Sequence, residues 1–524
     1  MPVRTRHRLA VAVIALVTAA CGTTVPLDQQ GVAPSAPQAL GTDAAMPNAA
    51  AGGDGLGTTG AGTGGAAPGA PAGTAGAAGA PAAGGAAGGG QTTGTAGATG
   101  GQQSSAVSRG GGAGGTGPGV DADSIHVGMY YSNDGDQANE STGFESNTAD
   151  ARQVYNAIIK DINRRGGVLG RRLKPVYFRV SAVTSQTLSE QAQAGCAHWH
   201  EDNEVFGVLG FPHPVVLECT QKVGGVSVGG VLGTFLTDTF RQYPEFIEPG
   251  GMDVETQAAV TINGLARQGY FSGGAPTGTK VGILTFDHEG FRRAVEGTAI
   301  PALARHGIPE PEVQYISPPQ RIQEVGNSSS EVQSAVLRFK SQNVTHVVIL
   351  EGAAGIAGGG HLMMLFTNSA EAQAYRPRYG LNSGSGLNGV SPQTPEGQLD
   401  KARAVGWVDP WDMPDRERMS NPAVERCRRI MKRAGLPSSG VPFADTQVKC
   451  EHVFFFAAAM ESGGVPHRDG FIAGAHGLGT GHTSTVALAT RFAPDQHDGV
   501  AAVRDAKYVP ACRCFHPASQ PYRP

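Results

Sequence analysis

The sequence predicts an α/β protein with two lobes, each built on a parallel β-sheet flanked by helices. Short apolar segments with strand-like alternation recur along the chain, separated by segments whose apolar residues have helical spacing. Strands and helices that alternate in this way form parallel sheets. Residues from about 33 to 119 are almost entirely Gly, Ala, Pro, Ser, Thr and Gln. Roughly 400 residues therefore remain, which is enough for two lobes of ordinary domain size.

The first strand–helix–strand unit opens the first lobe. Alternating apolar residues predict a strand over 124–131, and apolar residues at helical spacing predict a helix over 151–162. Gly166-Gly167 suits the left-handed end of that helix, and a second strand follows over 176–180. The remaining elements of this lobe are a helix over 188–198, a strand over 205–210, a helix over 214–223 and a strand over 226–230.

The second lobe repeats the alternation after a proline-containing crossing at 235–251. A helix capped by Asp253 opens it, and the sequence Ser328 to Glu331 resembles a capping box at the start of a later helix. Strands are expected at 280–286, 313–316, 345–350, 378–381 and 404–408, with a helix near 361–374 and another starting at 394–396.

Two further crossings complete the predicted hinge. Pro410-Trp411 is suited to the second crossing, after which helices at 423–434 and 445–462 return to the first lobe. The tail from about 486 to 514 crosses once more. The expected division is residues 120–251 plus about 411–500 for lobe 1, and 252–410 plus about 501–524 for lobe 2.

The N-terminus has the features of a bacterial export signal. Three arginines precede a short apolar run at 9–17, which is shorter than the about 20 residues of a membrane-spanning helix. Small residues then precede Cys21, and this arrangement resembles a lipobox, although Thr18 replaces the more usual leucine. We expect residues 1–21 to be a lipoprotein signal, with Cys21 lipidated on the outer face of the cell membrane and residues 22–119 a disordered linker. Ordinary secretion with an incidental cysteine is the alternative.

The segment INRRGGVLGRRLKPV, residues 162–176, resembles the first helix-to-strand turn of type I periplasmic binding proteins. This family includes the branched-chain amino-acid binding components of ABC transporters, similar to the Leu/Ile/Val-binding protein, and the resemblance extends over residues from about 124 to 515. It implies two Rossmann-like lobes joined by a multi-crossing hinge. It also implies a non-enzymatic, monomeric receptor without cofactor, which closes on a small solute such as an amino acid and presents it to an ABC permease.

Seven cysteines leave six once Cys21 is set aside, an even number that suits an oxidising compartment. Cys196 and Cys219 flank the strand at 205–210 and form one plausible disulfide in a region where the family often has one. Cys427 and Cys450 form a second plausible pair on two later helices. Cys512 and Cys514 either close a local ring or bond elsewhere.

Ligands of open α/β sheets bind beyond the carboxyl ends of the strands. We therefore expect the ligand between the two sheets, and the resemblance implies hydroxyls and backbone amides for a carboxylate and an acid for an ammonium group. Asp253, Asp287 and Glu351 are the candidate acids, although each also suits a helix cap or a solvated loop, Asp253 most clearly. The full set of candidate ligand-binding residues is Tyr131, Ser132, Phe211, His213, Thr234, Asp253, Asp287, Glu351, Asn382 and Trp411.

Three other functions are weaker interpretations of the sequence. Residues 225–229 match the G-x-S-x-G motif around Ser227, but the motif itself reads as a strand, whereas a nucleophile needs a strand before it and a helix after it. Two Cys/His clusters, at 196–200 and 512–516, offer metal ligands, yet disulfides are favoured, so no metal is expected. The net charge of −4 disfavours nucleic acid. A sensor that binds a ligand without transport remains an alternative to a transport receptor.

Overall fold

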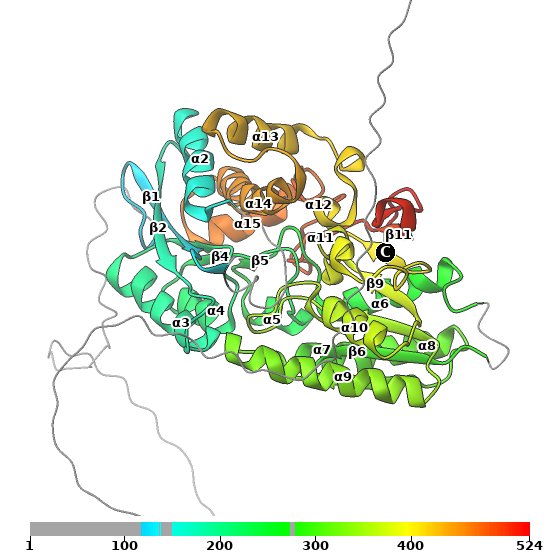
Figure 1. Ribbon diagram of the computed structural model, residues 1–524. Helices are drawn as coiled ribbons and strands as arrows, with labels where there is room; N and C mark the ends of the chain where they lie inside the picture. The colour runs from blue at the N-terminus through cyan, green and yellow to red at the C-terminus, as the bar shows by residue number, and fades with distance from the viewer. Residues whose placement is uncertain (1–116, 136, 138–148, 273–277) are drawn as a thin grey trace, which may run out of the picture. The chain divides into compact units, whose positions relative to one another are not determined.

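The computed structural model describes residues 117–135, 137, 149–272 and 278–524. Within this part, two mainly parallel sheets with helices packed against them confirm the predicted α/β fold class (Figure 1). The predicted signal peptide, Cys21 and most of the linker lie outside the described residues. None of the described helices is both long enough and apolar enough to cross a membrane.

The first sheet has the strand order β2-β1-β3-β4-β5, and all its pairs are parallel. Its strands are β1 (Ser124–Tyr131), β2 (Arg172–Arg179), β3 (Gly207–Leu209), β4 (Val226–Val228) and β5 (Phe246–Ile247). The early helices are α2 (Ala151–Arg164), α3 (Leu188–Cys196), α4 (Pro214–Lys222) and α5 (Thr237–Gln242). The helix predicted over 188–198 ends at Cys196 and continues as a π-helical turn, Ala197–Asp202.

Three late helices complete the core of this first sheet. They are α13 (Pro422–Ala434), α14 (Gly440–Gly463) and α15 (Arg468–Leu478), and Figure 1 shows them beside α2. Val127 and Met129 of β1 share one buried cluster with Cys427 of α13 and with Phe455 and Phe456 of α14. Residues far apart in the sequence therefore build a single core, whose burial is the main stabilising term.

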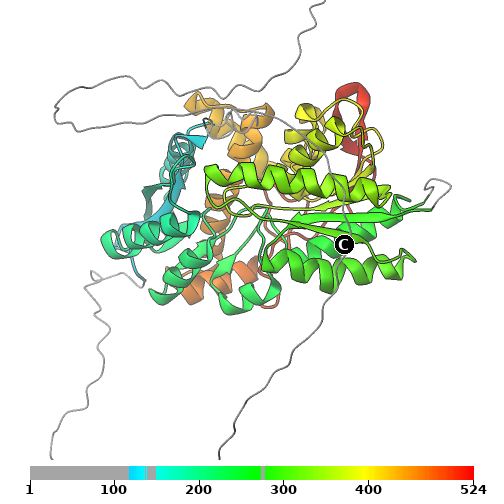
Figure 2. The same ribbon diagram turned by 60° about the horizontal axis from the view of Figure 1, so that its bottom comes forward.

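The second sheet has the order β12-β11-β10-β9-β8-β6-β7. Its parallel strands are β6 (Val281–Phe286), β7 (Glu312–Ile316), β8 (His346–Leu350), β9 (Arg378–Asn382) and β10 (Arg403–Gly406). The helices α6 (Val254–Arg267), α7 (Glu289–Ala294), α8 (Ile300–Arg305), α9 (Val325–Ser341) and α10 (His361–Ala372) pack against it, and Figure 2 shows helices on both of its faces. Two antiparallel strands, β11 (Arg504–Val509) and β12 (Cys514–Pro517), form its edge and were not predicted.

Two predicted helix starts were wrong. The expected capping box lies inside α9, which begins earlier, at Val325. The Ser328 hydroxyl donates to the carbonyl of Ser317, and Glu331 accepts the Ser317 backbone N–H. These two side chains therefore tie α9 to the end of β7 and do not cap the helix. The residues after Thr394 form turns, preceded by the short 3-10 turn Ser391–Gln393.

Three chain segments between the two sheets are hydrogen-bonded side by side. The backbone of Glu248 exchanges hydrogen bonds with His497 and Gly499, at 3.0 and 2.9 Å. The Asp409 N–H, at the start of α12 (Asp409–Asp412), donates to the Val486 carbonyl at 3.0 Å. Met252, Val405, Trp407, Val486 and Val503 are buried together here. This is the multi-crossing hinge of the predicted fold.

Candidate functional site

The carboxyl edge of the first sheet carries a cluster of aromatic side chains. Tyr130 lies near the end of β1, and Phe211 follows β3, with 5.1 Å between their ring centroids. Tyr130 is half-buried and Phe211 is buried. An edge of this kind is where open α/β sheets bind ligands. The pair offers an apolar surface beside the polar tyrosine hydroxyl.

Helix α14 adds two opposite charges to this edge. Asp445, Lys449 and His452 follow one another at spacings of four and three residues, so they share one helix face. Lys449 Nζ lies 2.5 Å from Asp445 Oδ2, and both side chains are largely shielded from solvent. Burial raises the pKa of Tyr130, while Lys449 opposes the shift and Asp445 adds to it, so both charges lie near the Tyr130 hydroxyl. The site can thus present a cation and an anion beside aromatic rings.

A buried histidine completes the cluster, which we call the edge cluster: Tyr130, Tyr155, Phe211, Asp445, Lys449 and His452. His452 Nδ1 lies 3.0 Å from the Tyr155 hydroxyl. Burial lowers the pKa of His452 to about 3, so its ring is neutral at pH 7. Burial also raises the pKa of Tyr155, so its hydroxyl keeps its proton. The hydroxyl has no other acceptor among the described residues, so it donates to Nδ1.

The ring proton of His452 then sits on Nε2, which has no hydrogen-bond partner among the described residues. A buried donor without a partner is costly, and a ligand acceptor would satisfy it. Gly210 permits this arrangement: its φ is +84°, and a Cβ there would lie 2.7 Å from the His452 ring and 2.9 Å from the Tyr155 hydroxyl. Only glycine fits this position without displacing the histidine.

Two other predicted residues of the first sheet have internal partners. The Ser132 hydroxyl donates to Asp134 at 2.8 Å. The His213 ring stacks on Phe211 with centroids 6.3 Å apart, and its Nδ1 accepts the Val215 N–H as a cap of α4. His213 therefore borders the edge cluster.

Tyr131 lies on the opposite face of β1 from its neighbour Tyr130. The Arg152 guanidinium lies 4.3 Å from the centre of the Tyr131 ring, and Tyr177 packs edge-on against that ring at 6.3 Å. The structure therefore places Tyr131 beside α2 and β2 and brings Tyr130 to Phe211.

The candidate acids of the second lobe are engaged within the fold. The buried Glu351 carboxylate accepts the backbone N–H groups of Leu362 and Met363 at 2.8 and 3.2 Å, and burial raises its pKa to about 8. Asp253 caps α6 by accepting two backbone N–H groups, both at 3.0 Å. Asp287 is half-exposed and forms an ion pair with Arg292 at 2.5 Å. Two of the three acids thus serve helix N-termini, where negative charge is stabilised.

The remaining predicted residues lie at the strand ends of the second sheet and in the hinge. Asn382 is buried, donates to Thr261 Oγ1 at 3.0 Å and accepts the Gly384 N–H at 2.8 Å. Trp411 packs half-buried against the hinge core. The loop containing Thr234 reaches the second sheet, because its Leu232 carbonyl accepts the Ala353 N–H at 3.1 Å. Thr234 is therefore close to the end of β8.

Ser227 has no nucleophile geometry. It lies inside β4 and is only 3% exposed. A nucleophile elbow would place it on a sharp turn between a strand and a helix.

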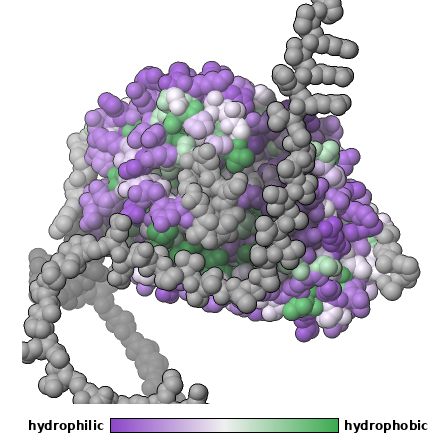
Figure 3. Space-filling model, viewed as in Figure 1, coloured by the Kyte–Doolittle hydropathy of each residue, from purple (hydrophilic) through white to green (hydrophobic). Residues whose placement is uncertain are grey.

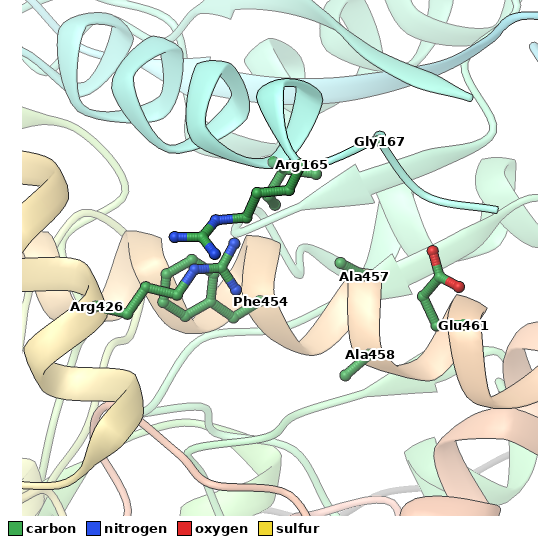
Figure 4. A pocket seen from close by; sticks show the side chains of 8 residues that line it. Arg165, Gly167, Arg426, Phe454, Ala457, Ala458 and Glu461 are labelled. Carbon is green, nitrogen blue, oxygen red and sulfur yellow. The ribbon is translucent and has the colours of Figure 1, made fainter. Parts of the chain in front are cut away.

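A cavity of about 240 Å³ lies between α2 and α14 (Figure 4). Arg165 and Arg426 converge at one end above Phe454, and Glu461 stands at the other. The Arg426 guanidinium lies 4.3 Å from the centre of the Phe454 ring.

Figure 3 shows a largely hydrophilic surface along the edge where Figure 1 places α2 and α13. Four arginines surround the buried Asp161 here: Arg164, Arg165, Arg426 and Arg433. The last two lie on α13, so their ion pairs tie α13 to α2.

The six cysteines that the structure describes lie in three close pairs. The Cα–Cα distances are 6.3 Å for Cys196 and Cys219, 6.1 Å for Cys427 and Cys450, and 5.2 Å for Cys512 and Cys514. These separations fall in the range that disulfides span. The bonds themselves stay predictions.

Comparison with known proteins identifies the fold. No protein-family model and no curated protein sequence matches this chain. Among solved structures, a branched-chain amino-acid ABC transporter protein from Thermus thermophilus with bound valine is 12% identical, with a TM-score of 0.55, over 77% of this chain and 97% of the other. A possible leucine/isoleucine/valine-binding protein from Rhodopirellula baltica SH 1 is 14% identical, with a TM-score of 0.54, over 76% and 97%. A fatty acid ABC transporter substrate-binding protein from Thermomonospora curvata is 14% identical, with a TM-score of 0.52, over 78% and 95%. The chain therefore has the type I periplasmic binding protein fold, as its sequence predicted.

Proposed function

We propose that this chain is an extracytoplasmic receptor that binds a small solute between its two lobes and presents it to an ABC permease. The observation that carries the proposal is the edge cluster at the carboxyl edge of the first sheet. An aromatic pair, a Lys449–Asp445 ion pair and a His452 N–H without a partner among the described residues meet there. The hinge supports it, because three adjacent crossings let the lobes move as units. Lipidation at Cys21 would hold the receptor at the membrane. The receptor would act as a monomer.

The chemistry of the edge cluster favours a zwitterionic solute with an apolar part, such as an amino acid or a related compound. Lys449 would pair with a ligand carboxylate, Asp445 with an ammonium group, and Tyr130 and Phe211 would contact the apolar part. The His452 N–H would donate to a carboxylate oxygen. Thr234 and the strand ends of the second sheet would close over the ligand from the other lobe.

Thermal denaturation against a panel of amino acids, amides, fatty acids and sugars tests this function. A ligand at 100 times its Kd adds about 2.7 kcal/mol to the stability of the native state, which moves Tm by a few degrees for a protein of this size. The Lys449→Gln variant should bind the hit at least about tenfold more weakly, because a charged hydrogen bond contributes roughly 1.5–3 kcal/mol. Lys432→Gln, on the exposed surface of α13, is the matched control and should leave the affinity unchanged.

Two results would contradict the proposal at different levels. Equal affinity of Lys449→Gln and Lys432→Gln for the ligand would show that the ligand does not bind at the edge cluster. Uptake of the hit that persists in cells lacking this chain would argue against delivery to a permease, while leaving binding in place. That second outcome would favour a receptor that senses its ligand without transport.

A further inference from the structure

A second chemical site lies on the edge hairpin of the second sheet, formed by β11 and β12. Cys512, Cys514 and His516 each place one ligand atom there, and the three atoms all lie within 4.8 Å of one another. Cys512 Sγ is 3.3 Å from His516 Nε2. Cys512 is exposed and the other two are half-buried, so an ion in solvent can reach all three. The sequence alone had favoured a disulfide here.

The backbone of the hairpin explains why these side chains converge. Cys514 and His516 are two residues apart in β12, so they lie on the same face of the strand. Arg513, with φ of +51°, turns the chain so that Cys512 returns toward them. Phe515 points to the opposite face and is fully buried. Asn388 clamps this strand, because it accepts the Phe515 N–H at 2.6 Å and donates to the Phe515 carbonyl at 3.0 Å.

A carboxylate orients the histidine. Glu417 Oε1 lies 2.9 Å from His516 Nδ1, on the side of the ring away from the cysteines. Histidines that bind metals usually donate their second ring N–H to a carboxylate or carbonyl in this way, which fixes the tautomer and the ring direction. The contact leaves Nε2 with a lone pair directed toward the two sulfur atoms.

We propose that Cys512, Cys514 and His516 form a thiolate–imidazole site for a zinc-like metal ion, which opens when the Cys512–Cys514 pair is reduced. Two thiolates and one imidazole, with a water molecule as the fourth ligand, make a tetrahedral set typical of zinc. The Cα atoms of Cys512 and Cys514 are 5.2 Å apart, within the range that a disulfide spans, so a bond between them must first open. A dithiol reductant supplies two electrons and two protons, becomes a disulfide itself and leaves two thiols. Metal binding then releases the two thiol protons to solvent.

This site is separate from the proposed solute site. Its ligands lie on β12 and the turn before it, and Glu417 lies in the turn after α12, so it shares no residue with the edge cluster. A metal bound here would link Glu417, which follows the second crossing, with the sheet edge reached after the third crossing. A test that contradicts the metal-site proposal would therefore leave the solute-binding proposal unchanged.

Cobalt binding to the full chain tests the proposal, because thiolate-bound tetrahedral Co²⁺ has strong sulfur-to-metal charge-transfer absorption. The chain is reduced with a phosphine, separated from it and titrated with Co²⁺ and then Zn²⁺ without oxygen. We expect one Co²⁺ per reduced chain with a charge-transfer band, its displacement by Zn²⁺, and no band in the oxidised chain. Glu417→Gln should keep the band but weaken binding about 10–100-fold. His516→Gln should lose the stoichiometric binding.

The double variant Cys512→Ser/Cys514→Ser is the matched control, because it retains the other five cysteines. It should show no band after the same reduction, while its Tm in the oxidised state stays near that of the parent chain. A band of equal strength in this double variant would overturn the proposal, since other cysteines would then hold the metal. An unchanged Co²⁺ affinity in His516→Gln would overturn it as well.

Discussion

Glu248 sits in the first hinge crossing and is fully buried. Its Oε1 accepts the Gly233 N–H at 3.1 Å, whereas its Oε2 has no partner among the described residues. Burial, with a smaller contribution from the nearby Asp498, raises the pKa of Glu248 from 4.5 to about 8. We therefore expect Glu248→Gln to stabilise the protein at alkaline pH, because the amide keeps the acceptor for Gly233 and removes the buried charge.

The sign and size of the stability change in Glu248→Gln follow from the difference in the pKa of Glu248 between the folded and unfolded states. Because the folded pKa is raised, the native state keeps a proton that the unfolded state loses, so Glu248 costs stability as pH rises from about 4.5 to about 8. At 1.36 kcal/mol per pH unit the full cost approaches roughly 5 kcal/mol. Relaxation around the charge reduces it, and the new amide N–H₂ lacks an acceptor at a cost of about 1 kcal/mol. The net gain in Glu248→Gln should be roughly 2–4 kcal/mol at pH 9 and vanish at pH 5.

Urea denaturation of the parent and the variant at pH 5, 7 and 9 measures this gain. The stability difference between the two chains should grow with pH over this range. Glu218→Gln is the matched control on the exposed face of α4, where its side chain is 57% exposed and pairs with Lys222. Its stability difference should stay within about 0.5 kcal/mol throughout. A pH-independent difference in Glu248→Gln would refute the reasoning that burial of this carboxyl controls the stability of the hinge.

Two further perturbations test the first lobe. Asp161→Asn should destabilise the protein by roughly 2–4 kcal/mol in urea, because four arginines would lose a partner that is only 3% exposed. Asp202→Asn is the control, because the Asp202 side chain is 69% exposed. Equal effects of the two substitutions would contradict this account. Gly210→Ala should cost about 1–3 kcal/mol from its positive φ and should also abolish the Tm shift by the ligand, because its Cβ would displace His452. Retained ligand binding in Gly210→Ala would show that His452 does not line the site.

Much of the fold could be predicted from the sequence because buried parallel strands and their covering helices have distinct periods. The strands of both sheets from β1 to β10 follow from short apolar runs, apart from the two-residue β5, which was expected only as part of a crossing. The edge hairpin β11–β12 could not be predicted in the same way. The segment before it, residues 485–503, is held by isolated bridges such as Val408 with Ala487 and Glu248 with Asp498. Isolated bridges of this kind leave no periodic pattern of apolar residues in the local sequence, because they depend on partners far away in the sequence.

The candidate site was less predictable than the fold. Alternation along β1 shows that Tyr130 and Tyr131 lie on opposite faces, but only the packing of α2 against β2 decides which face is which. Asp253 and Glu351 follow the rule that acids near strand ends are candidates, yet helix N-termini take up both carboxylates. A polar group that already has two backbone donors gains little from a ligand.

The residues missed by sequence reasoning share one cause. Asp445, Lys449 and His452 lie on α14, a helix whose other buried residues are mostly apolar, so their common face was the available signal. The residues of that face meet the edge of the first sheet only when α14 packs on it. In the sequence, α14 follows the parallel strands of the second sheet, so this contact is far from local. The edge cluster therefore depends on Tyr155 meeting His452 across 297 positions of sequence. In a fold whose chain crosses between the two sheets three times, local sequence points to only one wall of the proposed solute site. The wall from α14 has to come from the tertiary packing.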